Sequence, residues 1–318
     1  MLRHEIEHLV MLASCAPSVH NTQPWRLTAV DDGLVVRRDA GRLLGVIDPA
    51  GREQLISCGA MLHHLQVAAR AMAVDADVLV NAHDDDVARV RFHPGEPASE
   101  AEVSAAVAIL HRHTYRGRFT PEPVRGHDLD LVRLAAEAQG GLVRVVHEDE
   151  LVQVEVLVSR AQEVLRVMPG YQQELERWVW HRAVDDDTTR GDGVPQEALD
   201  HASDRAESLE SRDFDGPRPV PTEPPVAEHP ILVLLSSATD SPADWVQAGR
   251  ALSALLLRAT EIGLLAQPIG QALDLPASRY TLGQVLGTVG SPQMLLRLGH
   301  GTSAPTTPRR LVADVLTF

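Results

Sequence analysis

The strongest constraint on the fold is an internal repeat, because residues 58–74 and 248–264 resemble each other at an offset of 190 positions. Gly59 aligns with Gly249 near the head of each segment, and apolar residues recur at matching positions. Two amphipathic helices share such positions by chance fairly often. Strand-like sequence also flanks both copies, so the repeat favours a duplicated fold whose two halves pack together as a pseudo-dimer.

Helical and strand-like patterns alternate along both halves. Residues 25–30 and 34–38 alternate in strand fashion, and the acidic-glycine turn between them is typical of a β-hairpin. The remaining patterns predict strands at 74–80, 88–92, 230–237 and 294–301, and helices at 3–13, 51–74, 99–110, 126–139, 149–167, 171–181 and 245–265. We predict an α+β chain with an N-terminal half, 1–110, and a C-terminal half, 111–318, each a sheet flanked by helices.

Residues 183–229 break this pattern. They are rich in Asp, Pro, Gly and Arg and lack sustained periodicity, apart from a possible short helix near 196–210. A stretch of this length inside a compact chain is usually a lid or a disordered loop. We therefore predict a lid insertion at 183–229.

Composition excludes several classes of partner. A net charge of -15 argues against nucleic acid, which needs a basic face, and against an anionic membrane surface. All 29 basic residues are Arg, so Schiff-base lysine chemistry is excluded. Cys15 and Cys58 fit two reduced buried thiols better than a redox pair. With no signal peptide and no long apolar run, we expect a soluble, cytoplasmic protein.

One loop, APSVHNTQPWRL at residues 16–27, concentrates hydrogen-bonding side chains beside an indole. Residues 132–146 keep the helix and strand of a second copy but lack this loop. Conversely, the sequence before Met11 has no counterpart of the arginine-rich segment at 111–119. Because each half holds what the other lacks, we predict one composite site between the halves.

The arginine-rich segment suits an anion. Three arginines within residues 112–118 reverse the sign of an acidic chain, and guanidinium groups bind phosphate bidentately. A solvated basic turn is the competing interpretation, and a metal pair formed by His111 and His113 is disfavoured. Residues 307–310 could complete a phosphate pocket, and 266–270 either form an ordinary turn or bring backbone close to a flat ligand.

Other catalytic patterns are missing from the sequence. It has no G-x-S-x-G motif, no P-loop and no G-x-G-x-x-G fingerprint, so a hydrolase is disfavoured. His63 and His64 fit a packed or exposed helix face, and the acidic residues 84–86 fit a solvated turn better than a metal site. We assign no catalytic residue and no metal ligand.

Together these residues resemble the FMN-dependent nitroreductase family. The loop at 16–25 is similar to that family's Pro-Ser-x-x-Asn-x-Gln-Pro-Trp segment, and residues 112–119 resemble its N-terminal arginine-rich segment. Residues 263–270 and 307–310 resemble its flavin-edge and phosphate segments. The likeness covers nearly the whole chain apart from 183–229. Division of the motifs between two halves of one chain is similar to the Acg-like subgroup, fused nitroreductase-like proteins with one flavin site and a lid.

The resemblance implies a set of FMN contacts. Arg112, Arg309 and Arg310 would hold the phosphate, His113 and Thr114 would support it and the ribityl chain, and Arg116 would lie near the N1/O2 edge. The ring would meet the remaining residues, which are Pro17, Ser18, Val19 and Asn21 from the first half and Gln267, Pro268 and Ile269 at the N5/O4 edge. Gln23 and Trp25 would fix the loop.

The implied fold is the nitroreductase fold, tandem-duplicated, with one FMN. One hypothesis is an NAD(P)H-dependent oxidoreductase that reduces small nitro compounds or quinones. The other is a flavin-binding or flavin-sequestering protein with little turnover, which the insertion at 183–229 favours. A scaffold without flavin is weaker, because the arginines are retained. The chain would be a monomer with an internal pseudo-dimer or a homodimer.

Overall fold

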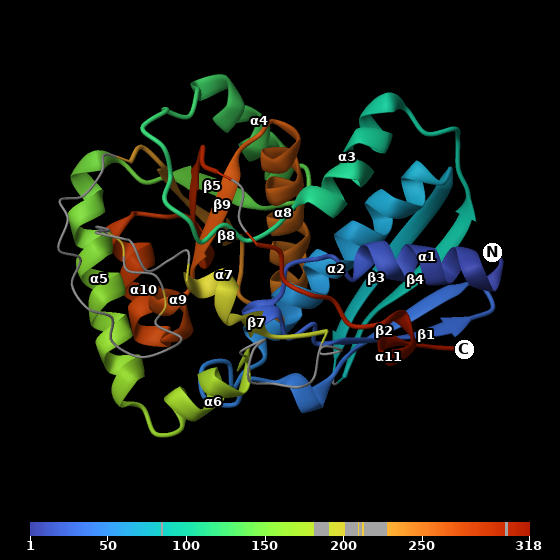
Figure 1. Ribbon diagram of the computed structural model, residues 1–318, viewed down its shortest axis with the longest axis horizontal. Coiled ribbons are helices and arrows are strands. Elements are labelled where there is room, and N and C mark those ends of the chain that lie inside the picture. Colours follow the sequence, from blue (N-terminus) through green and yellow to red (C-terminus); the bar gives the residue numbers. More distant parts are fainter. Residues whose placement is uncertain (84, 181–190, 201–208, 210–211, 213–227, 303–304) are drawn as a thin grey trace.

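A computed structural model describes residues 1–83, 85–180, 191–200, 209, 212, 228–302 and 305–318, and Figure 1 shows two sheets flanked by helices. The first sheet has the order β11-β1-β2-β4-β3, formed by Leu316–Thr317, Trp25–Val30, Gly33–Arg38, Asp86–Pro94 and Val74–His83. The second has the order β5-β8-β10-β9, formed by Leu142–Val145, Ile231–Ser237, Ser291–Gly299 and Leu265–Ile269. The short strands β6, Val179–Trp180, and β7, Val194–Pro195, pair in parallel.

Helices cover the sheets and connect them. The α-helices are α1 Arg3–Ala13, α2 Arg52–Ala71, α3 Glu100–His111, α4 Gly126–Glu137, α5 Glu148–Val167, α6 Tyr171–Arg177, α7 Gln196–Asp200, α8 Pro242–Glu261, α9 Gln271–Asp274, α10 Pro276–Val285 and α11 Val312–Val315. The 3₁₀ turn η1, Val19–Asn21, lies within the loop at 16–24, and a second one, η2 Ala40–Arg42, lies beside this loop. Among helices of the described residues, none combines the length and apolar character needed to cross a bilayer.

The predicted duplication is confirmed. The strand succession β1-β2-β4-β3 of the first sheet recurs as β5-β8-β10-β9 in the second, with α2 and α8 at equivalent places in the chain. Each half has its own apolar core: Leu62 and Leu65 of α2 belong to one, and Leu252 and Leu255 of α8 to the other. The α+β prediction, with a sheet and helices in each half, is therefore correct.

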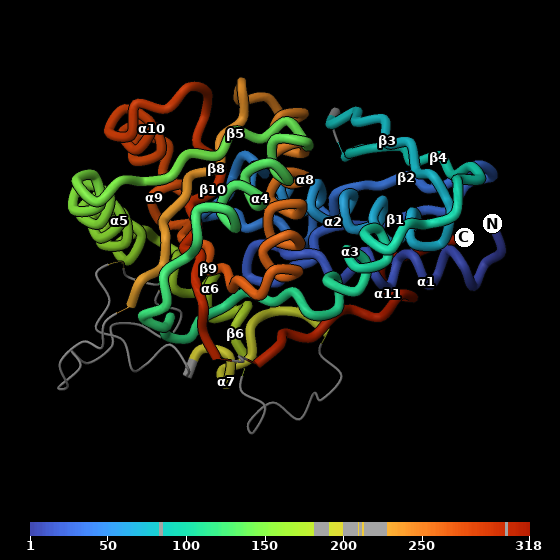
Figure 2. The backbone as a smooth tube through the Cα atoms, turned by 90° about the horizontal axis from the view of Figure 1, so that it is seen from above, coloured from blue at the N-terminus to red at the C-terminus, as the bar shows by residue number. Residues whose placement is uncertain are grey.

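The two halves meet where α2 and α8 cross, and Figures 1 and 2 show these helices side by side at the centre of the molecule. A Cβ atom added to Gly59 would lie 1.9 Å from the Val246 carbonyl oxygen, and one added to Gly249 would lie 1.9 Å from the Ile56 oxygen. The two contacts are equivalent under the 190-residue offset, as in a two-fold interface between subunits. Glycine at both positions lets the two backbones touch.

The end of the chain crosses to the other half. Strand β11 pairs in parallel with β1, with Leu316 opposite Leu27, so the C-terminal residues extend the first sheet. On the second sheet, Thr114 forms a parallel bridge with Ala266 at the free edge of β9. The segments at 112–119 and 307–310 are thereby fixed beside the loop at 16–24.

Several boundaries differ from the predictions. The helix predicted at 171–181 ends at Arg177 because the chain turns into β6, and Trp178 is only 6% exposed in a small core rather than on a helix surface. The helix predicted at 245–265 begins at Pro242, where Ser241 and Asp244 form a capping box, and it ends before β9. Helices α9 and α10 were not predicted.

Most of the predicted lid insertion lies outside the described residues. Its described parts include β7 and α7, and Leu199 of α7 is buried against a small core with Leu44 and Leu165. These parts pack on the body of the protein.

Candidate functional site

A cavity of about 1060 Å³, counted out to its open mouth, lies between the two halves. The N-terminal half contributes Pro17, Ser18, Val19, His20, Glu53, Ile56 and Ser57 to its wall. The C-terminal half contributes Thr114, Tyr115, Arg116, Leu199, Arg212, Leu252, Leu256, Gln267, Pro268, Gly270, Gln271, Asp274 and Met294. A largely apolar wall with a few polar groups is typical of a site for a cofactor or small-molecule ligand.

The loop at 16–24 forms one wall in an unusual backbone conformation. His20, Asn21 and Gln23 have φ of 47°, 54° and 47°, in the left-handed region that non-glycine residues seldom adopt. Such residues cost about 1–3 kcal/mol each and persist only where surrounding contacts impose them. Here the Val19 amide donates to Ser57 Oγ at 3.1 Å, and the Gln23 amide donates to Ser18 Oγ at 3.0 Å.

The amide side chains of the loop brace it from behind. Asn21 Nδ2 donates to the carbonyl oxygens of Gly193, at 2.8 Å, and Pro308, at 3.0 Å. Gln23 Nε2 donates to the Gly191 oxygen at 2.7 Å, and Gln23 Oε1 accepts from the Arg310 amide at 2.9 Å. Both side chains are buried. They tie the loop to the insertion and to the C-terminal segment.

Two buried arginines converge beside this loop without a carboxylate. Arg112 Nη2 and Arg309 Nη2 both donate to the Cys15 carbonyl oxygen, at 3.2 and 3.1 Å, and neither Nε has a hydrogen-bond partner. Within the described part of the chain, no acidic side chain forms an ion pair with either of them. Burial and the neighbouring Arg309 lower the pKa of Arg112 to about 9. Arg309 Nη1 also donates to oxygens of Asn21, Thr307 and Pro308, so both positive groups are held by neutral acceptors alone, and such a site favours an anion.

The arginine pair adjoins the cavity through the chain itself. Arg112 lies two residues before Thr114, and Cys15 lies two residues before Pro17; both Thr114 and Pro17 line the cavity. Two residues of extended chain span about 7 Å. Neither arginine is part of the cavity wall. Arg112 lines a smaller hollow that shares Leu256 with the cavity, so the anion-favouring site lies next to the cavity.

Arg310 lies elsewhere. It lines a separate polar hollow with Arg26, Arg42 and Asp39, where its Nη1 is 3.9 Å from Asp39 Oδ2 and 3.2 Å from the Gln23 oxygen. Burial and the nearby Arg42 lower its pKa. The structure thus separates Arg310 from Arg112 and Arg309.

The other predicted residues divide into two groups. Those that line the cavity are Pro17, Ser18, Val19, Thr114, Arg116, Gln267 and Pro268. Outside its wall are Asn21, Ile269, which is 1% exposed in the core beneath β9, and His113, whose Nδ1 lies 2.9 Å from the His111 oxygen. The structure therefore brings most, but not all, of the predicted contacts to one cavity.

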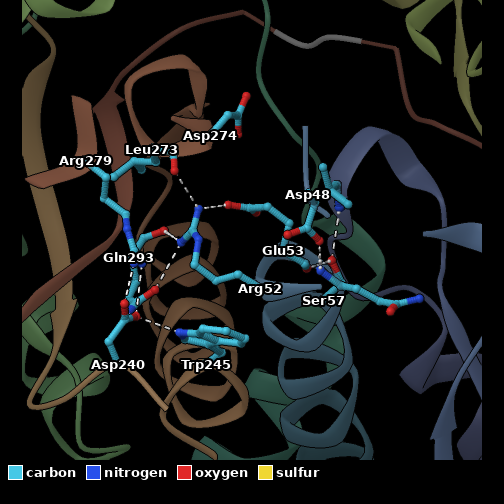
Figure 3. A network of polar contacts seen from close by, with 12 residues as sticks. Asp48, Arg52, Glu53, Ser57, Asp240, Trp245, Leu273, Asp274, Arg279 and Gln293 are labelled. Carbon is cyan, nitrogen blue, oxygen red and sulfur yellow. Dashed lines mark hydrogen bonds and ion pairs between the residues drawn. The ribbon is translucent and has the colours of Figure 1, made fainter. Parts of the chain in front are cut away.

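Sequence reasoning missed a charged network at another part of the wall. Glu53 pairs with Arg52, which also donates to the backbone and side-chain oxygens of Gln293 at 2.9 and 3.0 Å, as Figure 3 shows. Burial raises the pKa of Glu53 although Arg52 opposes the shift, and burial raises that of Asp274 although Arg212 opposes it. Glu53 has the pattern of an ordinary first-turn acid of a helix, so no local signal singles it out.

His20, within the quoted loop, was also not assigned. It is buried on the cavity wall, and burial, Arg212 and Arg116 hold its pKa well below the usual value. Its imidazole is therefore neutral at physiological pH. A neutral ring can offer both a donor and an acceptor to a ligand.

Proteins of Mycobacterium tuberculosis resemble this chain over nearly its whole length. No family model matches the sequence. The Mycobacterium tuberculosis H37Rv protein named "Putative NAD(P)H nitroreductase acg" is 32% identical over 98% of this chain and 94% of its own length. An uncharacterized protein of the same strain is 31% identical over 98% of this chain and 92% of its own length.

Solved structures of nitroreductases also resemble about two thirds of this chain. A nitroreductase with bound FMN from Desulfitobacterium hafniense is 18% identical, with a TM-score of 0.40, over 68% of this chain and 97% of its own. The FMN and NADPH-dependent nitroreductase NfnB from Sphigopyxis sp. strain HMH is 18% identical, with a TM-score of 0.41, over 67% of this chain and 98% of its own.

Proposed function

This chain belongs to the family of the mycobacterial protein Acg, and we propose that its central cavity binds FMN and supports NAD(P)H-dependent reduction of small nitro compounds or quinones. The names of the relatives support the reaction class. The cavity supports an organic ligand with an anionic group, because its wall is largely apolar and the anion-favouring site lies next to it.

The observation that carries the proposal is the pair Arg112 and Arg309. Guanidinium groups shielded from water are normally paired with acids. Arg112 and Arg309 are instead held by neutral oxygens, among them the Cys15 carbonyl that both share, and their Nε atoms have no partner. A phosphate monoester dianion would supply the missing acceptors and charge. The residues present therefore fit the phosphate end of FMN.

The other contacts follow the resemblance. When bound, FMN supplies the redox chemistry, since its N5 accepts and donates hydride. Thr114 would support the ribityl chain, and Arg116 would stabilise negative charge at the N1/O2 edge. Pro17, Ser18 and Val19 would face the ring, with their loop held by Ser57. At the opposite edge Gln267 and Pro268 would border N5 and O4.

Asn21, His113, Ile269 and Arg310 remain predicted contacts. In the described structure Asn21 and Arg310 bond to protein groups, and Ile269 is packed in the core. Asn21 would therefore serve the flavin by shaping the loop. Arg310 would do so by holding the Gln23 backbone.

A second candidate function is flavin binding with little turnover. Two described residues of the insertion, Leu199 and Arg212, line the cavity, and Arg212 is ion-paired with the buried Asp274. Although burial favours the neutral form, Asp274 and Tyr171 raise the pKa of Arg212. A wall that includes the insertion would limit access of a nicotinamide to the flavin.

One experiment separates these candidates. The purified protein is examined for yellow FMN, loaded with FMN if it is colourless, and mixed with NADPH or NADH without oxygen. Rapid bleaching would support the reductase and count against storage. Persistent yellow would support storage, and a protein that stays colourless with added FMN would refute both.

The proposal extends to setting and assembly. We expect the protein to act in the cytoplasm, as a monomer or a homodimer. The crossing of α2 and α8 supports a monomer, because one chain already supplies both halves of the cavity. Light scattering of the FMN-loaded protein tests the assembly.

A further inference from the structure

A third polar group lies buried beside the arginine pair. His64 of α2 is 0% exposed, and neither of its ring nitrogens makes a hydrogen bond, although the Leu12 carbonyl lies near the ring. A buried imidazole without a partner loses the free energy that water would have supplied. The mechanism proposed above does not use this residue, so its isolation has no explanation yet.

The helix packing brings His64 to the anion-favouring site. The end of α1, the middle of α2 and the end of α3 share one apolar core, which contains Leu12, Leu65 and Ile109. Cys15 follows the end of α1, and Arg112 caps the end of α3. His64 lies beside Leu65 in the middle of α2, and the Leu12 carbonyl lies near its ring, so the ring faces the end of α1 that leads to Cys15.

Electrostatics agree with this placement. Burial lowers the pKa of His64 most, followed by Arg112, the neighbouring His63 and Arg309. Both arginines are therefore close enough to oppose a proton on this ring. The ring is neutral and carries one N–H group, and neither ring nitrogen makes a hydrogen bond of normal geometry in the structure.

Unpartnered donors cluster here. Arg112 Nε, Arg309 Nε and the ring of His64 all lack hydrogen bonds, and so does Ser14 Oγ, next to Cys15. Elsewhere in folded proteins such groups are rare, and an absent ion or ligand is a common explanation for several in one place. One tetrahedral dianion offers enough oxygen acceptors for all of them.

We propose, on the basis of the function proposed above, that His64 is a third ligand of the FMN phosphate. It would donate a ring N–H from α2 to the dianion held by Arg112 and Arg309. The site then draws on both halves, because His64 and Cys15 belong to the first half and the arginines to the second. A bound dianion would also relieve the repulsion between the two guanidinium groups.

The test compares FMN with riboflavin, which lacks the phosphate. Dissociation constants of both flavins are measured by fluorescence quenching for the apo-protein and for His64→Leu, His64→Gln and His63→Gln. His63 is the matched control, because this buried neighbour has its own partner, Ser253 Oγ, at 2.8 Å from Nδ1. His64→Gln keeps an N–H donor and provides a second variant should His64→Leu not fold.

We expect His64→Leu to weaken FMN binding by about tenfold or more, the scale of a hydrogen bond to a charged group, and to leave riboflavin binding unchanged. His64→Gln should retain part of the FMN preference, and His63→Gln all of it. Inorganic phosphate should raise the melting temperature of the wild-type apo-protein more than that of His64→Gln.

Two results would overturn the inference. An unchanged FMN-to-riboflavin ratio in both His64 variants would remove His64 from the phosphate site. An equal loss for both flavins would assign it a structural role only. A wild-type protein that binds neither flavin would instead refute the proposed function, so the two failures are distinguishable.

Discussion

Replacing Gly59 by Ala should separate the two halves of the molecule. The added Cβ would lie 1.9 Å from the Val246 carbonyl oxygen and 3.1 Å from the Gly249 Cα. Both obstacles are backbone atoms, so no side chain can rotate away, and α2 and α8 must move apart by more than 1 Å. A gap of 0.5–1 Å already forfeits about a quarter to a half of each dispersion contact.

The magnitude follows from two opposing terms. Overpacking of this kind costs about 1–3 kcal/mol, and a rigid obstacle places it at the upper end. Alanine is favoured over glycine within a helix by about 1 kcal/mol, which offsets part of that loss. We expect a net loss of about 2 kcal/mol, or a fall in melting temperature of about 3 °C, because the unfolding entropy is about 2.1 cal/mol/K for each of the 318 residues.

Thermal and urea unfolding of the apo-protein measure this loss. Gly126→Ala is the control, because an added Cβ at this first residue of α4 meets nothing within 4 Å. Gly249→Ala should behave like Gly59→Ala, since its added Cβ meets the Ile56 oxygen at the same 1.9 Å. A Gly59→Ala protein as stable as Gly126→Ala would refute the close approach of the two helices.

Four further predictions concern the site and its surroundings. Arg112→Ala should weaken FMN binding by about 1.5–3 kcal/mol in a fluorescence titration, and an unchanged affinity would refute the phosphate assignment. Burial raises the pKa of Asp48 to about 7, above its unfolded value of about 3.9, so the stabilising proton is lost as pH rises through 7. Asp48→Asn should therefore be more stable than wild type to urea at pH 8 and lose this advantage at pH 4; the reverse order would contradict the burial. Because burial raises the pKa of Cys58 to about 12, its thiol should resist a disulfide reagent until the protein unfolds, and rapid labelling of the native protein at this residue would disprove that. The double change Arg212→Ala and Asp274→Asn should speed bleaching by NAD(P)H if the insertion covers the cavity, whereas equal stopped-flow rates would count against a cover.

The fold was predictable where the signal is periodic and local. The repeated helices and the hairpin at Asp31–Gly33 follow from spacing, and the capping box at Ser99 and Glu102 marks the start of α3. Strand β9, Leu265–Ile269, was not predicted, because its residues have the pattern of a turn. Short elements escaped prediction because their signals are weak. Helix α9 has only four residues, and tertiary contacts determine such a turn more than propensity does.

The site was predictable only in part, for a different reason. A motif names residues that are close in sequence, but it does not say which face of the segment each side chain takes. Arg309 and Arg310 are neighbours in the chain, yet one points to Cys15 and the other to Gln23 and Asp39. Glu53 and His64 became candidates only once burial and missing partners were known.

The single site follows from an asymmetric connection between two halves whose sheets and central helices correspond. The contact between α2 and α8 treats the halves alike, but only the C-terminal end crosses over, where β11 pairs with β1. On its way the crossing segment is held by Asn21, which donates to the Pro308 oxygen, and by Gln23, which accepts from the Arg310 amide. This clamp carries Arg309 to the Cys15 oxygen, where α3 has already brought Arg112. The amide side chains of the loop at 16–24 therefore position the arginine pair, and Asn21 Oδ1 also accepts a hydrogen bond from Arg309 Nη1 at 3.2 Å. The loop and the anion-favouring site form one unit, and a second copy would need a second crossing end.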